Sequence, residues 1–282
     1  MERDYLSDDL RVKATTAWTF KDLNSERGTE QFVDLGFDKN IFPRPKPLGT
    51  ILRPLLLSTK KGDVVLDFFS GSSTTAHAVM QLNAEDGGNR RFIMVQIPEP
   101  CDEKSEAYKA GYRNICEIGK ERIRRAGEKI KADSPLTTAD LDVGFRVFKL
   151  ADSNMKDVYY AADELDQQTL ADMVSNIKED RTALDLFFGC LLDWGLPLSM
   201  PYHSEEIDGC TVHTYNDGDL IACFDKNIPE SVVKEIAKRK PLRAVFRDAG
   251  FADSPAKINV FEIFKLYMPE DADDITKRVK VL

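Results

Sequence analysis

The segment Val64–Ala78 constrains the fold of this chain more than any other, because it predicts a strand, a tight turn and a helix in direct succession. Its first five residues are apolar except for Asp67, as expected for a short buried strand with a carboxylate at its end. Gly71 permits a tight turn, and Ser73 or Thr74 can cap the helix that follows. In an open α/β sheet, this layout brings main-chain N–H groups close to a small ligand beyond the strand ends.

The turn after Gly71 lacks both common phosphate-binding patterns. A dinucleotide fingerprint needs further glycines, whereas Ser72–Ala76 contains none, and a Walker-type loop needs a Gly-Lys-Ser/Thr sequence that is also missing. The predicted ligand is therefore not held through phosphates. A carboxylate at the strand end suits a ligand with a positively charged amine. S-adenosylmethionine has such an amine, together with a ribose that needs a hydroxyl acceptor.

Several motifs resemble those of a known enzyme family. Asp67–Ala78 resembles the cofactor motif of amino-group DNA methyltransferases, Asp-x-Phe-x-Gly-Ser-Gly-Thr-Thr, and Phe42–Leu48 resembles the Lys-Pro motif that precedes it in adenine-N6 enzymes of the β arrangement. Phe92–Pro100 and Gly111–Ala126 are similar to the modification (Mod) subunits of Type III restriction–modification systems. The likeness is specific over about 18–126 and looser up to the carboxyl terminus.

Two departures from the family pattern affect the predicted activity. Ser73 replaces the second glycine of the cofactor motif, which leaves slightly less room beside the cofactor. The family's catalytic loop, Asp/Asn/Ser-Pro-Pro-Tyr/Phe/Trp, binds the target amine and stacks on the flipped base, but the chain contains no Pro-Pro pair. In the β arrangement this loop precedes the target-recognition region and the cofactor motif. The chain therefore resembles the carboxyl-terminal part of a longer methyltransferase, and we predict no catalytic residue and no DNA methylation by the chain alone.

The resemblance implies roles for individual residues toward S-adenosylmethionine. Asp67 binds the methionine amine, Lys46 lies by the carboxylate, and the amides of 71–74 line the methionine and ribose. Thr74 and Thr75 also cap the helix. The full predicted set of cofactor-binding residues is Lys46, Asp67, Phe68, Phe69, Gly71, Ser72, Ser73, Thr74, Thr75, Gln96, Pro98 and Glu99.

Some of these assignments leave alternatives open. The ribose hydroxyls are assigned to Gln96, with Glu99 as the alternative, and Phe68 and Pro98 either flank the adenine or, in the case of Phe68, pack in the core. The whole turn could also be an ordinary strand–turn–helix without a ligand, and Lys46 a solvated lysine. His77 is more simply explained as a structural residue than as a catalytic one.

Composition limits the other functions. The net charge of −9 does not resemble that of a nucleic-acid-binding domain, so we expect DNA contact through the parent enzyme and only weak binding by this chain. Five scattered cysteines and three histidines form no ligand-spaced pair, so no metal site is predicted. The cysteines indicate reduced thiols in a cytoplasmic protein. No signal core or membrane span is predicted.

The predicted fold is of the α/β class: an incomplete Rossmann-like, S-adenosylmethionine-dependent methyltransferase domain followed by a smaller α+β domain. Residues 1–41 are a lead-in from a missing recognition region, expected to be loosely held. Residues 42–131 form the cofactor-binding part, 132–142 a linker, and 143–282 the second domain.

Hydrophobic periodicity and turn signals predict the individual elements. Helices are predicted at 30–35, 48–58, 74–83, 112–131, 163–178, 182–194, 230–240 and 256–267, and strands at 64–68, 92–97, 144–150, 210–215, 219–224, 242–246 and 279–282. Strand 92–97 is expected to be covered on both faces. The basic side of helix 112–131 is expected to be a solvated face, with phosphate contact as the alternative; it carries Lys120, Arg122, Arg124, Arg125 and Lys129.

The resemblance also implies partners. In the whole enzyme, the family transfers a methyl group to N6 of a flipped adenine, and a restriction (helicase–nuclease) subunit and a second Mod subunit are its protein partners. The alternative function is that of an interaction module, in which the second domain self-associates or docks the restriction subunit.

Overall fold

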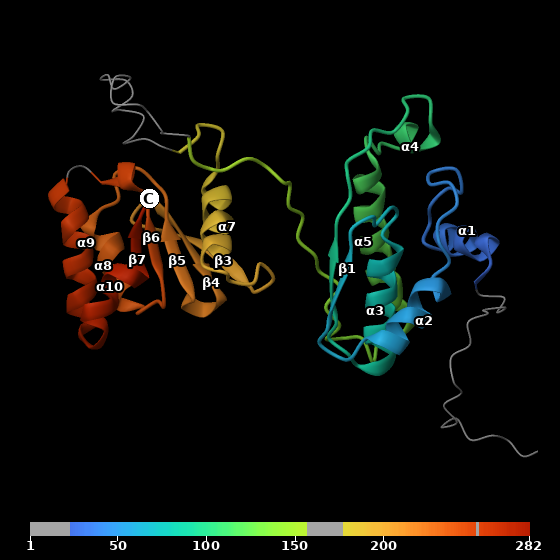
Figure 1. Cartoon of the computed structure of the whole chain (residues 1–282), viewed down its shortest axis with the longest axis horizontal. Coiled ribbons are helices and arrows are strands. Elements are labelled where there is room, and N and C mark those ends of the chain that lie inside the picture. Colours follow the sequence, from blue (N-terminus) through green and yellow to red (C-terminus); the bar gives the residue numbers. More distant parts are fainter. Residues whose placement is uncertain (1–22, 157–176, 252–253) are drawn as a thin grey trace, which may run out of the picture. The chain divides into compact units, whose positions relative to one another are not determined.

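The computed structural model describes residues 23–156, 177–251 and 254–282. The chain divides into two compact units, Met1–Phe145 and Arg146–Leu282, which we call unit 1 and unit 2 (Figure 1). In the described part of the chain, no helix is both long and apolar enough to cross a bilayer.

Unit 1 contains a parallel pair of strands with helices packed against it (Figure 1). Its elements are α1 (Ser25–Asp34), α2 (Gly49–Ser58), β1 (Val64–Asp67), α3 (Thr74–Asp86), β2 (Arg91–Met94), α4 (Glu106–Lys109) and α5 (Ile115–Asp133). Val65 of β1 lies opposite Phe92 of β2, and α3 connects the two strands. The predicted strand–turn–helix–strand order is confirmed.

Local signals explain where the helices of unit 1 begin and end. The Asn24 side chain accepts a hydrogen bond from the Arg27 N–H and so caps α1. Asn114 caps α5 in the same way, which starts this helix at Ile115 and not at 112. Gly87 ends α3 in the left-handed conformation that glycine adopts without strain.

Helix α3 forms the centre of unit 1. Ala76 and Met80 pack into a core with α1 and α5, while Val79 packs into a second core with Leu55 of α2. The inner-face residue Val65 of β1 joins that second core. Because α3 is enclosed by helices and by the sheet, it is buried on almost all sides.

The opposite face of the two-stranded sheet is exposed, which contradicts the predicted burial of both strands. Val64 and Leu66 of β1 are 48% and 59% exposed, and Ile93 and Val95 on the second strand and its extension are 52% and 49% exposed. Hydrophobic runs predict that a face will be covered, but they do not say by which chain segment. Among the described residues, helices cover only the inner face.

The segment before residue 42 is more firmly packed than predicted. Phe32 of α1 is fully buried, and Phe37 and Ile41 are almost fully buried in the same core as α5. The rings of Phe32 and Phe37 stack with their centroids 4.2 Å apart. Gly28 allows this packing, because a Cβ there would lie 2.0 Å from the Pro45 carbonyl oxygen. The described part of the lead-in, 23–41, is therefore a structural part of unit 1.

Unit 2 is built on a five-stranded mixed sheet (Figure 1). Its elements are α7 (Ala183–Asp193), β3 (Tyr202–Ile207), β4 (Cys210–Tyr215), η2 (Asn216–Gly218), β5 (Leu220–Cys223), α8 (Glu230–Lys238), β6 (Ala244–Phe246), η3 (Asp248–Gly250), α9 (Ser254–Tyr267), η4 (Pro269–Asp274), α10 (Ile275–Arg278) and β7 (Val279–Val281). The strand order is β3-β4-β5-β6-β7, with β3, β4 and β5 antiparallel and β5, β6 and β7 parallel.

Helices pack on both faces of this sheet. Val212 and Phe246 point into a core with α8, α9 and α10, whereas Tyr215 and Val245 point into a second core with α7. Phe187 of α7 is fully buried there. The sheet of unit 2 is thus covered on both sides by its own chain.

In the second half, one predicted strand is wrong, one observed strand was not predicted, and one predicted helix is not tested. The strand predicted at 144–150 is wrong, because these residues form no regular element. Strand β3 was not predicted, since its sequence, Tyr-His-Ser-Glu-Glu-Ile, lacks apolar alternation and occupies a largely exposed sheet edge. The helix predicted at 163–178 lies almost entirely outside the described residues. The strands predicted at 210–215 and 219–224 are confirmed, and they pair antiparallel on either side of Asn216–Gly218.

Candidate functional site

The carboxylate of Asp67 lies at the end of β1, directly before the predicted cofactor turn. Its Oδ2 accepts a hydrogen bond from the Thr75 hydroxyl at 2.6 Å, and its Oδ1 accepts one from the Phe69 N–H at 3.1 Å. Asp67 is only half-buried. A carboxylate offers about four acceptor positions, so these two bonds orient it and leave acceptor capacity for a ligand.

Gln96 joins the turn to the segment that follows β2. Its Oε1 accepts a hydrogen bond from the Gly71 N–H at 2.8 Å. Two main-chain bonds strengthen the same connection, from Ser70 N–H to the Val95 carbonyl at 3.2 Å and from Val95 N–H to the Asp67 carbonyl at 2.8 Å. Three residues predicted to share a site, Asp67, Gly71 and Gln96, therefore lie at adjacent ends of two parallel strands.

Backbone conformation explains the glycines of the family motif. Gly71 has φ 51° and Ser73 has φ 61°, both in the left-handed region. A glycine adopts this region freely, whereas a serine does so at a cost of roughly 1–2 kcal/mol. Ser73, which stands where the family motif has its second glycine, therefore holds a strained conformation in the turn.

The predicted capping of α3 by its hydroxyl residues is wrong. Ser73 occupies the N-cap position but makes no side-chain capping bond. The Thr75 hydroxyl donates to Asp67, and the Thr74 hydroxyl accepts from Arg122. These side chains bind tertiary partners, which local sequence preferences do not reveal.

The remaining predicted residues are largely exposed. Phe68 and Phe69 are 62% and 78% exposed, with their ring centroids 5.2 Å apart, so Phe68 is not a core residue. Lys46, Pro98 and Glu99 are also exposed. In the sequence, they lie before and after the turn. Their contact with a ligand stays a prediction.

Arg122 is the residue that sequence reasoning missed. It was assigned to the solvated side of the long helix, but its side chain is 0% exposed. Its Nη1 donates to the Ser72 hydroxyl at 2.9 Å and to the Thr74 hydroxyl at 2.7 Å. Burial lowers the pKa of its guanidinium to about 10, so it stays charged at neutral pH. The available signal in the sequence was Gly119, a glycine inside the predicted helix, one turn before Arg122. It indicates a close contact of this helix face, because a Cβ at Gly119 would be 2.6 Å from the Ser73 hydroxyl oxygen.

His77, one turn into α3, is buried close behind the same turn. Burial, together with the positive charges of Arg122 and Lys129, lowers the pKa of its imidazole to about 3. The ring is therefore neutral at physiological pH. A neutral, almost fully buried ring agrees with the structural role assigned to it.

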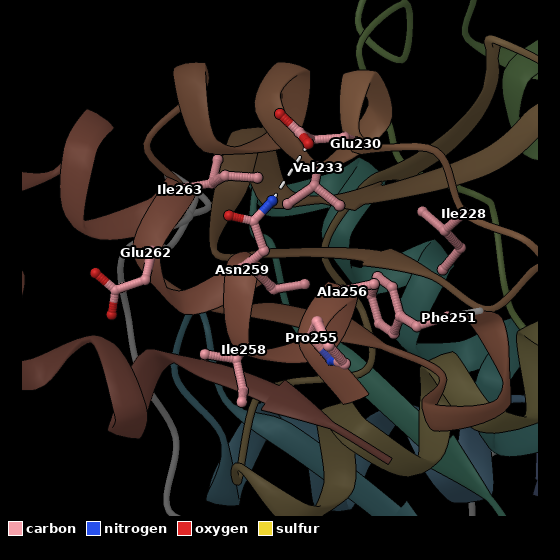
Figure 2. A pocket seen from close by; sticks show the side chains of 11 residues that line it. Ile228, Glu230, Val233, Phe251, Pro255, Ala256, Ile258, Asn259, Glu262 and Ile263 are labelled. Carbon is pink, nitrogen blue, oxygen red and sulfur yellow. Dashed lines mark hydrogen bonds between the residues drawn. The ribbon is translucent and has the colours of Figure 1, made fainter. Parts of the chain in front are cut away.

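A hollow of about 570 Å³ lies in unit 2 (Figure 2). Ile228, Val233 and Phe251 make part of its apolar lining, and its few polar groups include Asn259, which donates to Glu230 at 3.2 Å. Figure 2 shows Glu262 pointing away from these two residues. The hollow presents no arrangement of nucleophile and base.

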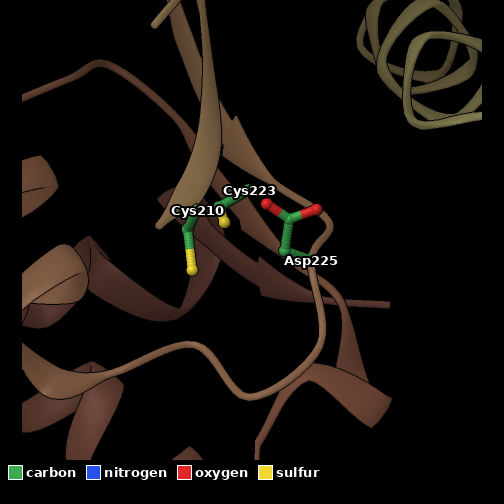
Figure 3. A group of neighbouring side chains, drawn as sticks. All are labelled: Cys210, Cys223 and Asp225. Carbon is green, nitrogen blue, oxygen red and sulfur yellow. The ribbon is translucent and has the colours of Figure 1, made fainter. Parts of the chain in front are cut away.

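Two buried cysteines of unit 2, Cys210 and Cys223, lie together with Asp225, with ligand atoms within 4.8 Å of one another (Figure 3). Burial raises the pKa of the Cys223 thiol to about 12 and raises that of Cys210, and the Asp225 charge adds to both effects. The Asp225 carboxylate accepts a hydrogen bond from the Thr211 N–H. Without a bound cation, both thiols are therefore neutral at physiological pH.

The turn, with its carboxylate, left-handed glycine and following helix, occurs within a matched family region. Residues 2–126 match the family model described as DNA methylase. This region of the chain is therefore similar to the DNA methylases.

Individual relatives support this placement. The chain is 45% identical over 128 residues to the Mod subunit of the Type III restriction–modification enzyme StyLTI of Salmonella typhimurium, which is 45% of this chain and 19% of the relative. It is 34% identical over 217 residues to the EcoPI Mod subunit of Escherichia phage P1, 76% of this chain and 32% of the relative. It is 36% identical over 121 residues to the Type II methyltransferase M.KpnI of Klebsiella pneumoniae, 43% of this chain and 29% of the relative. The chain thus spans between a fifth and a third of these curated relatives.

Proposed function

We propose that unit 1 binds S-adenosylmethionine and that the chain is the cofactor-binding, carboxyl-terminal part of a Type III adenine-N6 DNA methyltransferase. The observation that carries the proposal is the meeting of Asp67, Gly71 and Gln96 at the ends of two parallel strands. Ligands of open α/β sheets bind at this edge.

The residues of the turn fit the chemistry of the cofactor. The half-buried Asp67 carboxylate suits the methionine amine. Because Gln96 is occupied by the Gly71 N–H, we assign it to holding the turn and assign the ribose hydroxyls to the exposed carboxylate of Glu99. Phe68 and Pro98 are proposed to flank the adenine. When bound, the cofactor supplies an electrophilic methyl group, and the protein's contribution is to orient it toward the acceptor.

The wider role follows from the family. The acceptor is proposed to be N6 of a flipped adenine in DNA, with a restriction subunit and a second Mod subunit as partners. Because the chain lacks a Pro-Pro-aromatic loop, we propose that it binds the cofactor without methylating DNA by itself. Transfer of labelled methyl groups to duplex DNA by the purified chain, above a no-enzyme blank, would contradict this second part.

Calorimetric titration with S-adenosylhomocysteine tests the binding proposal. Wild type is expected to bind, and Asp67→Asn is expected to lose about 10–100-fold in affinity, the usual effect of losing a hydrogen bond to a charged group. Asp63→Asn is the matched control, because Asp63 is an exposed residue just before β1 whose carboxylate accepts a hydrogen bond from the Lys60 N–H. No heat with wild type, or equal losses in both variants, would refute the proposal.

A further inference from the structure

Strand pairing in unit 2 brings together two cysteines that are far apart in the sequence. Cys210 is the first residue of β4 and Cys223 the last residue of β5, and these strands are antiparallel neighbours. Val212 lies opposite Cys223, so Cys210, two residues earlier on the same strand, points to the same face of the sheet. Both cysteines are buried in the core with α8 and α9. The sequence alone predicted no metal site, because it contains no closely spaced pair of cysteines.

A carboxylate completes this group of side chains. Asp225 lies two residues after Cys223, and its ligand atom and the two sulfur atoms all lie within 4.8 Å of one another (Figure 3). A buried cysteine alone is an ordinary core residue, since a thiol packs like a small apolar group. Two thiols and a carboxylate that converge are instead ligands of the kind that Zn²⁺ binds. Bonds of about 2.0–2.3 Å to a tetrahedral ion place ligand atoms roughly 4 Å apart, so small side-chain rotations are sufficient to form such a site.

Main-chain hydrogen bonds position two of the three groups. The Thr211 N–H donates to Oδ2 of Asp225, which fixes the carboxylate beside the sulfur atoms. Burial raises the pKa of the Cys223 thiol to about 12, but a hydrogen bond from the Asp225 main chain acts in the opposite direction, because it stabilises the thiolate. Hydrogen bonds of this kind orient metal ligands and tune their affinity.

We propose that Cys210, Cys223 and Asp225 form a site for a thiophilic divalent cation, Zn²⁺, that ties the end of the β4–β5 pair to the segment leading into α8. The ion forms two Zn–S bonds and one Zn–O bond, and the two thiol protons pass to the solvent. The charge of the metal overcomes the effect of burial, since a coordinating thiol is deprotonated. The fourth position is left to a water molecule, because Asp225 is partly exposed. The inference concerns unit 2 and does not depend on the proposed cofactor function.

Calorimetric titration of the reduced, untagged chain with Zn²⁺ tests the site. Wild type is expected to bind about one ion per chain and to release about two protons, measured from the heats in buffers of different ionisation enthalpy. Cys223→Ala is expected to lower the affinity about 100-fold or more, because loss of an outer partner already costs about 10–100-fold. Cys190→Ala is the matched control and is expected to leave the affinity unchanged, because Cys190 is also buried but packs in the other core of unit 2.

A second measurement identifies the ligand atoms. Co²⁺ in place of Zn²⁺ is expected to give thiolate-to-metal charge-transfer absorption in wild type and in Cys190→Ala, and a weaker band in Cys210→Ala. Asp225→Asn keeps both sulfur atoms and can still accept from the Thr211 N–H, so it tests the carboxylate with the core intact. This variant is expected to keep the absorption and to bind Zn²⁺ about tenfold or more weakly.

Each outcome decides the inference. No binding of Zn²⁺ by reduced wild type, or equal losses in Cys190→Ala and Cys223→Ala, would overturn it. Binding of Co²⁺ without thiolate absorption would also overturn it, because the ion would then lie on carboxylates elsewhere. If Cys223→Ala does not fold, Asp225→Asn decides, and an unchanged affinity in that variant would refute the three-ligand site. None of these results changes the titration with S-adenosylhomocysteine, so the two proposals fail separately.

Discussion

The two units differ in how their sheets are covered. The five strands of unit 2 have a helical core on each face, contributed by α7 on one side and by α8, α9 and α10 on the other. Within the described residues, the two strands of unit 1 have helices on one face only, while the other face carries exposed apolar residues such as Leu66 and Ile93. Unit 2 therefore closes its own core, and unit 1 leaves half of its sheet open.

This difference shows what unit 1 lacks. Parallel strands occur almost only where both faces are covered, and large exposed apolar patches mark interaction surfaces. The curated relatives are three to five times longer than their match to this chain. The open face agrees with the proposal that unit 1 is one part of a larger methyltransferase domain.

The largest expected effect on stability comes from substituting one phenylalanine in each unit. Phe246→Ala in unit 2 is expected to lower the free energy of unfolding by about 3–5 kcal/mol, because it leaves a cavity in a closed core. Phe69→Ala in unit 1 is expected to change it by less than about 0.5 kcal/mol, because that ring is exposed. Urea unfolding of both variants measures the difference. A similar loss in Phe69→Ala would mean that this ring is covered in solution.

Acid should destabilise unit 1 through His77. Its pKa is about 3 in the folded state and 6.5 in an unfolded chain, so below pH 6.5 only the unfolded state takes up this proton. Stability is complete above pH 6.5 and decreases as the pH falls toward 3, at about 1.4 kcal/mol per pH unit and a few kcal/mol in total. Thermal unfolding measured from pH 7 to 4 tests this.

The variant His77→Leu should flatten that pH dependence, since it removes the titrating group. His203→Leu in unit 2 is the control, because that ring is largely exposed. Equal pH dependence in wild type and His77→Leu would contradict the assignment of acid sensitivity to unit 1.

Two helical glycines give a smaller contrast. Gly28→Ala in unit 1 is expected to cost about 1–3 kcal/mol, because the new Cβ would collide with the Pro45 backbone. Gly189→Ala in α7 of unit 2 meets only the Asn154 side-chain amide at 2.7 Å, which can move. Alanine favours helix by up to about 1 kcal/mol over glycine, so Gly189→Ala should be neutral or stabilising. Thermal unfolding of both variants compares their stabilities. A stabilising effect of Gly28→Ala would show that α1 does not pack closely against the backbone at Pro45.

Much of the fold was predictable from local signals. The strand, turn and helix at 64–86 follow from an apolar run, Gly71 and helix-forming residues, and the hairpin of unit 2 follows from Asn216–Gly218. Strand β3 was missed because a polar edge strand carries no apolar alternation. The strand predicted at 144–150 was wrong because alternation without a neighbouring strand does not form a sheet.

For the site, the sequence alone predicted the family resemblance and the turn, because both depend on the type and spacing of residues such as Asp67 and Gly71. Tertiary structure decided which side chains meet there. Helix α5 lies against the turn at Gly119 and so buries Arg122, although the charge pattern placed this residue on a solvated face. Burial depends on which elements pack together, a long-range property that periodicity along one helix does not contain. The exposure of one face of β1 and β2 could not be predicted for the same reason. An apolar run indicates that a strand needs a covering surface, but it does not say which segment provides it.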